Sequence, residues 1–99
     1  MSDIIKMDYP SMEEMSHTFR NAAETMEDLI RELQIMARQL EDGVLLGRGG
    51  DSLRSVIGDK LVPAIKRLGD KFNELSMDIY GALVDLRDSD IEAESRFKG

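Results

Sequence analysis

The sequence predicts an all-α fold, a helix-turn-helix αα-hairpin that assembles as a four-helix-bundle dimer. Apolar residues recur with heptad spacing in two long segments, and four of the eight glycines lie together between these segments. The chain has 99 residues, of which 41% are hydrophobic, so it is long enough for one folded domain only. We expect this domain to comprise an N-terminal arm at 1–10, a central glycine-rich loop at 42–50 and a C-terminal tail at 87–99.

The first helix is predicted over residues 11–41. Ser11 and Glu14 have the spacing of a capping box, and Pro10 precedes them, just outside the expected helix. The apolar residues that follow alternate in steps of three and four, which is the a/d pattern of a heptad repeat. Its larger members, the predicted core of the first helix, are Met12, Met15, Phe19, Met26, Leu29, Leu33, Met36 and Leu40.

The second helix is predicted over residues 51–96, with Asp51 or Ser52 as its cap. Leu53, Ile57 and Leu61 are spaced by four residues, a stutter that unwinds a supercoil locally. Pro63 lacks the N–H that an α-helix needs, so we expect a kink near 58–63, and a break into two helices is the alternative. The predicted core of this helix is Leu61, Ile65, Leu68, Phe72, Leu75 and Ile79.

The apolar surface of both helices is wider than one hairpin can bury. Two paired helices cover only one seam, whereas Ile30, Ile35, Val62, Met77 and Leu83 extend the apolar stripe beyond the a/d positions. Such a stripe suits four helices better than two, and this is the reason for predicting a dimer.

The composition argues against several functions. Thirteen basic and twenty acidic residues give a net charge of −7, which disfavours nucleic acid as a partner. Cysteine is absent, and no apolar run has the length of a membrane span. The N-terminal sequence lacks the basic start and apolar core of a cleaved signal peptide, so we expect any export to use another route.

No residue pattern predicts catalysis, a metal or another cofactor. Glu14 and His17 have the Glu-x-x-His spacing of di-iron bundles, but the heptad places both on the outward face. The glycine-rich stretch at 47–52 lacks the lysine of a phosphate-binding loop and follows a helix rather than a strand. We therefore expect His17 to be a solvated surface residue and this stretch to be a connecting loop.

The chain resembles the WXG family, the small helical-hairpin substrates of type VII secretion. The resemblance rests on two long amphipathic helices around a central glycine-bearing loop, over nearly the whole length of the chain. Leu45 and Gly47 occupy the positions of the family's Trp-x-Gly motif, with leucine in place of tryptophan, and Leu53 follows eight residues after Leu45. Leu45 and Gly47 are therefore the candidate loop motif.

The family also carries a C-terminal export signal. Its strict form, Tyr-x-x-x-Asp/Glu, is not present, because Tyr80 is followed four residues later by Val84. A looser form has an apolar residue, an acid four residues later, and apolar residues at plus seven and plus eleven. The positions that match this looser form lie along one helical face and are the candidate export signal: Leu86, Asp90, Ala93 and Phe97.

The resemblance implies a secreted, non-enzymatic protein without a cleaved signal peptide. By analogy with the family, the chain would form an antiparallel four-helix dimer with itself or with a paralogue. The type VII secretion ATPase would then recognise the loop of one chain together with the tail of the other. The alternative function is a cytoplasmic helical adaptor or targeting factor that pairs with the N-terminal domain of a larger secreted toxin.

Overall fold

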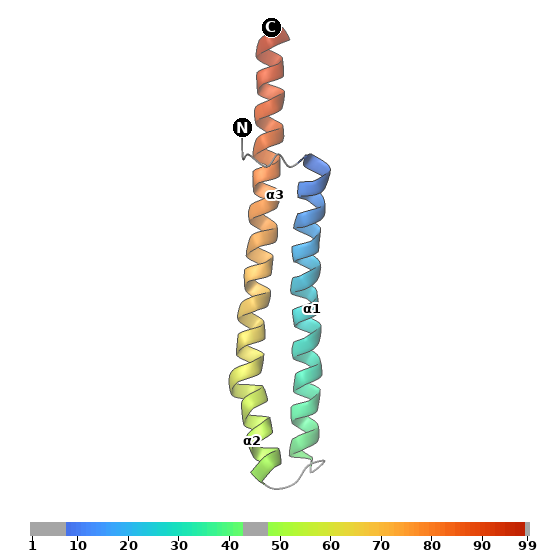
Figure 1. Cartoon of the computed structure of the whole chain (residues 1–99), viewed down its shortest axis with the longest axis vertical. Helices are drawn as coiled ribbons and strands as arrows, with labels where there is room; N and C mark the ends of the chain where they lie inside the picture. Colours follow the sequence, from blue (N-terminus) through green and yellow to red (C-terminus); the bar gives the residue numbers. More distant parts are fainter. Residues whose placement is uncertain (1–7, 43–47, 99) are drawn as a thin grey trace, which may run out of the picture.

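The computed structural model, which describes residues 8–42 and 48–98, confirms the all-α helical hairpin. Helix α1 (Tyr9–Glu41) runs alongside an opposing helical rod made of α2 (Arg48–Val56), a π-helical turn η1 (Ile57–Leu61) and α3 (Val62–Lys98). The molecule is a rod of 76 × 28 × 17 Å, and the C-terminal part of α3 projects beyond the start of α1 (Figure 1). The dimer that the sequence predicts remains a prediction.

The cap of α1 differs from the predicted one. Asp8, not Ser11, is the N-cap, and its side-chain carboxylate accepts a hydrogen bond from the backbone N–H of Ser11 at 2.8 Å. Hydrogen bonds from the side chain and the backbone of Ser11 hold the pKa of Asp8 below its usual value. Pro10 lies inside the first turn. The backbone N–H groups of a first turn have no acceptor within the helix, so the N–H that proline lacks is not needed there. The helix therefore begins at Tyr9 instead of residue 11.

The second rod begins earlier than predicted and does not break at Pro63. Asp51 and Ser52 lie inside α2 rather than capping it, and the helix continues to Lys98 instead of ending at residue 96. The kink predicted near 58–63 takes the form of the π-helical turn, in which the N–H of Val62 bonds to the carbonyl of Ile57, five residues back.

The π-helical turn also explains the stutter that precedes Pro63. A π-turn holds more residues than an α-turn, so residues spaced by four stay on one side of it. Ile57 is consequently buried against α1, with 3% of its surface exposed. The wider turn also changes the hydrogen-bond register just before the proline, whose ring would crowd the carbonyl of Asp59 in a regular α-helix.

Helix α1 and helix α3 approach each other closely where their facing residues are small. Ser16, Ala23, Gly69 and Ser76 are all buried where α1 meets α3. A Cβ atom placed on Gly69 would lie 3.3 Å from the Cβ of Met26, so the glycine leaves little room between the helices. We call these four small residues the hairpin seam.

Two serines link the helices by reciprocal hydrogen bonds. The Ser16 hydroxyl donates to the Ser76 carbonyl at 3.0 Å, and the Ser76 hydroxyl donates to the Ser16 carbonyl at 2.8 Å. Both side chains are about 97% buried, and each hydroxyl has a partner, so the desolvation cost of burying them is offset. The bonds fix the register of α1 against α3.

Loss of either serine hydroxyl should destabilise the hairpin. We expect Ser16→Ala and Ser76→Ala each to lower the free energy of unfolding by about 1 kcal/mol, because each removes one buried hydrogen bond. Urea unfolding at a fixed protein concentration measures this. Ser89→Ala is the matched control: Ser89 lies exposed in α3, and its replacement should leave stability unchanged or slightly raised. Equal effects at all three positions would contradict a role for the serine pair.

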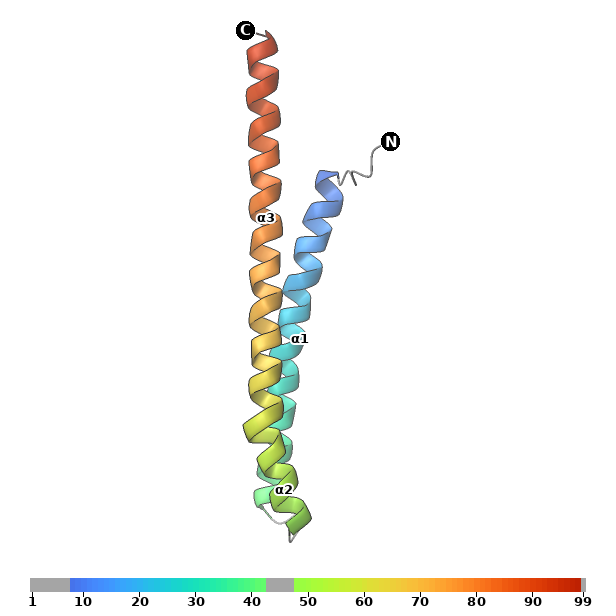
Figure 2. The ribbon, with the colours of Figure 1, turned by 60° about the vertical axis from the view of Figure 1, so that its left-hand side comes forward.

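The first turn of α1 is attached to α3 near the far end of the hairpin. The Tyr9 hydroxyl donates to the Leu86 carbonyl at 3.4 Å, and the Arg87 guanidinium lies 5.5 Å from the centre of the Tyr9 ring. Arg87 also forms an ion pair with Glu13 at 3.7 Å. Beyond these contacts α3 continues without α1 beside it, and Figure 2 shows this projecting segment from a second direction.

Candidate functional site

The predicted core residues divide into two groups in the structure. One group packs between α1 and the opposing helical rod. It consists of buried Met12 and the half-buried residues Phe19, Met26, Leu33, Leu40, Ile65, Phe72 and Ile79. The rings of Phe19 and Phe72 are in contact, with their centres 6.0 Å apart. This group is the core of the hairpin itself.

The other group lies on one side of the hairpin and is not covered by it. Met15, Met36, Leu61 and Leu68 are exposed, with 51% of the Met36 surface and 46% of the Leu68 surface accessible. The sequence predicted these residues for the core of the hairpin or of its dimer, and in the single chain they are not buried. We call the surface formed by Met15, Met36, Leu53, Leu61 and Leu68, together with half-buried Leu29 and Leu75, the exposed stripe.

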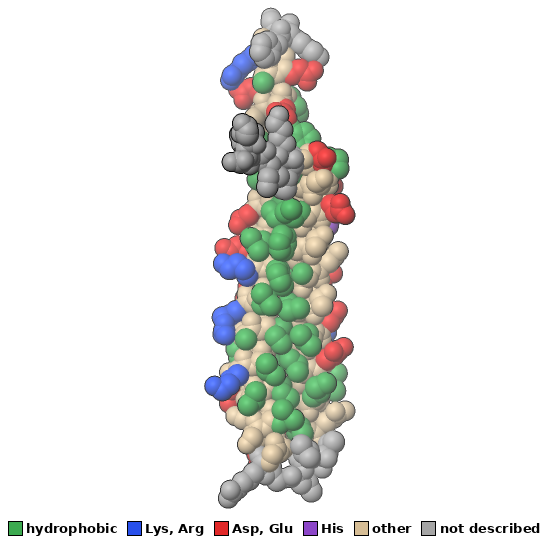
Figure 3. Space-filling view, viewed as in Figure 1, with side chains coloured by type: hydrophobic (Ala, Val, Ile, Leu, Met, Phe, Trp, Pro, Cys, Tyr) green, Lys and Arg blue, Asp and Glu red, His purple; other side chains and the backbone are tan. Residues whose placement is uncertain are grey.

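The exposed stripe is continuous along the hairpin. Figure 3 shows a band of hydrophobic side chains running lengthwise where α1 and α3 meet, with Lys and Arg gathered along the α3 edge and Asp and Glu along the α1 edge. A contiguous apolar surface rimmed by charge is typical of a protein interaction site. The stripe is therefore the candidate functional site of this chain.

The stripe is hollowed near the loop end. A shallow groove there is lined almost wholly by apolar side chains, with Gln39 as the one polar residue. Its walls come from α1 and from the rod on both sides of the π-helical turn: Leu33, Met36, Leu40, Leu53, Ile57 and Leu61. Such a groove can receive apolar side chains of a docked helix, and it holds no group suited to catalysis.

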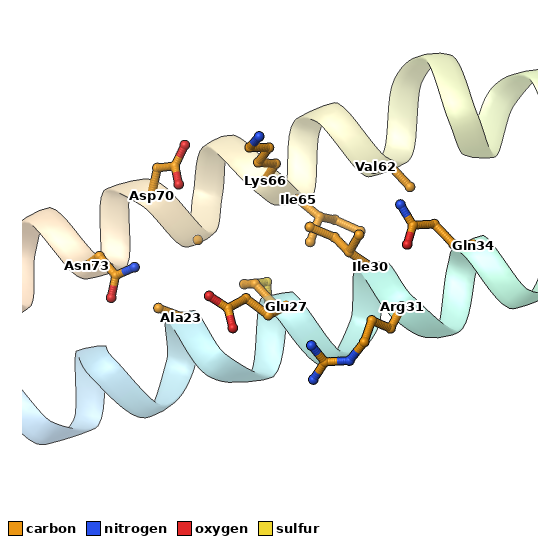
Figure 4. A pocket seen from close by; sticks show the side chains of 12 residues that line it. Ala23, Glu27, Ile30, Arg31, Gln34, Val62, Ile65, Lys66, Asp70 and Asn73 are labelled. Atoms are coloured by element: carbon orange, nitrogen blue, oxygen red, sulfur yellow. The ribbon is translucent and has the colours of Figure 1, made fainter.

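A second groove follows the opposite face of the hairpin. Ala23 and Gly69 are among the residues that line it, and Glu27, Arg31 and Lys66 contribute polar side chains (Figure 4). Both signs of charge are present within a short distance, so the groove has no clear preference for an anion or a cation. We assign no function to it.

The candidate export signal lies at the projecting end of α3. The side chain of Leu86 is 47% exposed, and Asp90 and Ala93 are exposed on the segment that α1 does not accompany. The backbone of Phe97 is helical, whereas its side chain lies outside the described residues. No described residue of α1 covers this part of α3.

The other sequence predictions fall on the surface or outside the described residues. Glu14 and His17 are exposed, as the heptad predicted, and His17 lies 4.0 Å from Glu13. Within residues 8–42 and 48–98, no three His, Asp or Glu side chains are grouped so that they could hold a metal ion. The loop motif residues Leu45 and Gly47 lie outside the described residues.

None of the helices in the described part of the chain is both long and apolar enough to cross a membrane. No family model, curated protein or solved structure matches the sequence or the fold of this chain. The exposed stripe and the projecting end of α3 are the structural features that bear on function.

Sequence reasoning missed the hairpin seam, because three of its four residues are polar or glycine. A signal was nevertheless present. Ser16 and Ala23 are seven residues apart, and so are Gly69 and Ser76, with buried Leu83 seven residues further on. Small residues repeated every seven positions next to an apolar heptad indicate a close helix–helix contact.

Proposed function

We propose that the chain is a non-enzymatic substrate, or co-secreted partner, of a type VII secretion system and is exported as a folded helical dimer. The observation that carries the proposal is the exposed stripe, an apolar surface that the hairpin leaves uncovered along its length. A dimer with a second copy or a paralogue would cover this surface, and the projecting segment of α3 would remain available to the secretion ATPase.

The acidic projecting segment is consistent with recognition by a receptor. Asp88, Asp90 and Glu92 stand exposed on the projecting segment, and Glu92 pairs with Arg96 one turn further on at 2.7 Å. An exposed acidic segment that no described residue of α1 accompanies is a surface that a basic receptor groove can bind. Leu86 and Asp90 lie one turn apart on the same helical face, within reach of one binding groove.

Export from the native host tests the proposal. The protein is measured in cells and in culture medium, with and without the secretion ATPase, and a cytoplasmic protein serves as the lysis control. We expect the chain in the medium only when the ATPase is present. Protein that stays in the cells under every condition would contradict the proposal and favour the cytoplasmic adaptor that pairs with a larger toxin.

A point variant tests the export signal separately. We expect Asp90→Ala to lower export while the dimer remains intact, because the side chain is exposed and makes no contact with α1. Asp88→Ala is the matched control, since this neighbouring acid lies on a different side of α3. Unchanged export by Asp90→Ala and by a chain without residues 86–99 would overturn the assignment of the signal.

A further inference from the structure

We infer that the side of α3 opposite the exposed stripe is a docking surface for a basic amphipathic helix of a partner protein. This surface consists of Met77, Tyr80, Val84 and Ile91, and we call it the back face of α3. It takes no part in the pairing or in the export signal of the proposed function, so the inference goes beyond that function.

The back face carries the most exposed large apolar side chains of the hairpin. Within the described part of the chain, Met77 and Ile91 lead with 73% and 65% of their surfaces accessible, and Tyr80 is 51% exposed. Val84, half-buried, lies between Tyr80 and Ile91. Successive members are three, four and seven residues apart, which places all four on one side of the helix. Exposed apolar residues that share one helical side form a surface that a second helix can cover.

The back face is separate from the surfaces described above. Leu68 of the exposed stripe and Leu86 of the candidate export signal are each nine residues from Met77. Nine residues are about two and a half turns of an α-helix, so both leucines lie on the opposite side of α3. A partner on the back face therefore leaves the stripe and the export signal accessible.

The centre of the back face is open to close approach. Gly81 lies one turn after Met77, and nothing lies within 4 Å of a Cβ atom placed on it. A glycine at this position lets the backbone of a second helix come near. The face extends over the 14 residues from Met77 to Ile91, or ~21 Å at ~1.5 Å per residue, so it matches a partner helix of about four turns.

Acidic side chains border the back face. Asp78 and Asp85 are seven residues apart and share one edge of it, and Asp88 lies on the face itself, one turn after Val84. All three aspartates are exposed, and none of them forms an ion pair within the part of the chain that the structure describes. A docked partner can therefore pair with these carboxylates.

The one basic residue between Met77 and Ile91 does not neutralise this edge. The guanidinium of Arg87 pairs with Glu13 at 3.7 Å and lies 5.5 Å from the centre of the Tyr9 ring, and both of these residues belong to α1. Carboxylates beside an apolar face favour a partner that brings lysine or arginine. They disfavour an anionic membrane surface, which attracts basic segments.

Peptide binding tests the charge and the amphipathic character of the partner. The probe is a fluorescein-labelled peptide of about 15 residues, with leucine on one helical side and lysine elsewhere. We expect saturable binding to the full chain by fluorescence anisotropy. A peptide with glutamate in place of lysine, and one with the same residues in an order without helical periodicity, should bind at least about tenfold more weakly. Equal binding of either control peptide would overturn a basic amphipathic helix as the partner.

Two apolar substitutions locate the binding surface. Met77→Ser should weaken binding of the lysine peptide by about 10–100-fold, because the partner loses an apolar side chain to cover. Leu68→Ser is the matched control, half a turn away on the exposed stripe, and should leave this affinity unchanged. A loss of binding by Leu68→Ser and not by Met77→Ser would assign the peptide to the stripe and overturn the inference.

Two charge reversals separate the back face from the export signal. At low ionic strength we expect Asp88→Lys to weaken binding of the lysine peptide by about tenfold. Asp90→Lys should have little effect, because Asp90 lies on the side of α3 that carries Leu86. Equal effects of both reversals would show a response to net charge alone and overturn the back face as the site. Export depends on Asp90 instead, so failure of either claim is distinguishable from failure of the other.

Two other occupants of the back face give different results. If the back face bound a second copy, Met77→Ser would weaken self-association in sedimentation equilibrium. If it bound a membrane, the chain would bind vesicles of phosphatidylcholine and phosphatidylglycerol, and Met77→Ser would abolish this binding. Either result would overturn a basic helix as the partner.

Discussion

Leu68→Asp should abolish the dimer while leaving the hairpin folded. Leu68 is at the centre of the exposed stripe and is 46% exposed in the single chain, so an aspartate there remains solvated in the monomer. In the dimer, two leucine side chains would be lost, at about 1.5–3 kcal/mol each. We therefore expect the dissociation constant to rise by about 10²–10⁴-fold, measured by sedimentation equilibrium.

The control for Leu68→Asp is the same substitution at Met77. Among the side chains of α3 that the structure describes, Met77 is the most exposed large apolar one, with 73% of its surface accessible, and it lies away from the stripe. Met77→Asp should leave both the dimer and the circular dichroism spectrum unchanged. If the two variants weakened the dimer equally, the exposed stripe would not be the surface that pairs.

Gly69→Leu should destabilise the hairpin itself. Even a Cβ atom at this position lies 3.3 Å from the Cβ of Met26 and 3.9 Å from the carbonyl oxygen of Ala23, so a leucine forces the helices apart. Overpacking of this kind costs about 1–3 kcal/mol. Separation of the helices would also strain the serine pair seven residues further along α3, which adds to this cost. Chemical denaturation at one fixed protein concentration gives the value.

Gly81→Leu is the matched control, because it makes the same chemical change in the same helix. Nothing lies within 4 Å of a Cβ atom at Gly81, and the residue is exposed. Replacing a helical glycine by leucine should there stabilise the protein by about 0.5–1 kcal/mol through helix propensity. Stabilisation by both substitutions would show that the seam tolerates side chains, contrary to the close contact described above.

The heptad spacing was sufficient to predict the hairpin and both helices to within a few residues. The spacing was less informative about which residues are buried in the hairpin, because one apolar series contains both the hairpin core and the exposed stripe. Phe19 and Met36 belong to the same 3–4 series, yet one packs inside the hairpin and the other faces outward. A pattern of hydrophobicity cannot separate these two faces, since both are apolar.

The local details depended on contacts that a pattern does not contain. The capping box favoured Ser11, but Asp8 caps the helix because Pro10 is tolerated in the first turn. The kink was predictable from Pro63 and the four-residue spacing before it, whereas its form as a π-helical turn was not. The serine pair escaped prediction because Ser16 and Ser76 are 60 positions apart in the sequence.

The mass of the chain in solution tests the central claim most directly. Sedimentation equilibrium over a wide range of concentrations should give twice the chain mass of 11.2 kDa, because a second copy would cover the exposed stripe. A mass of 11.2 kDa throughout the range would contradict the account, since no second copy would then cover the stripe.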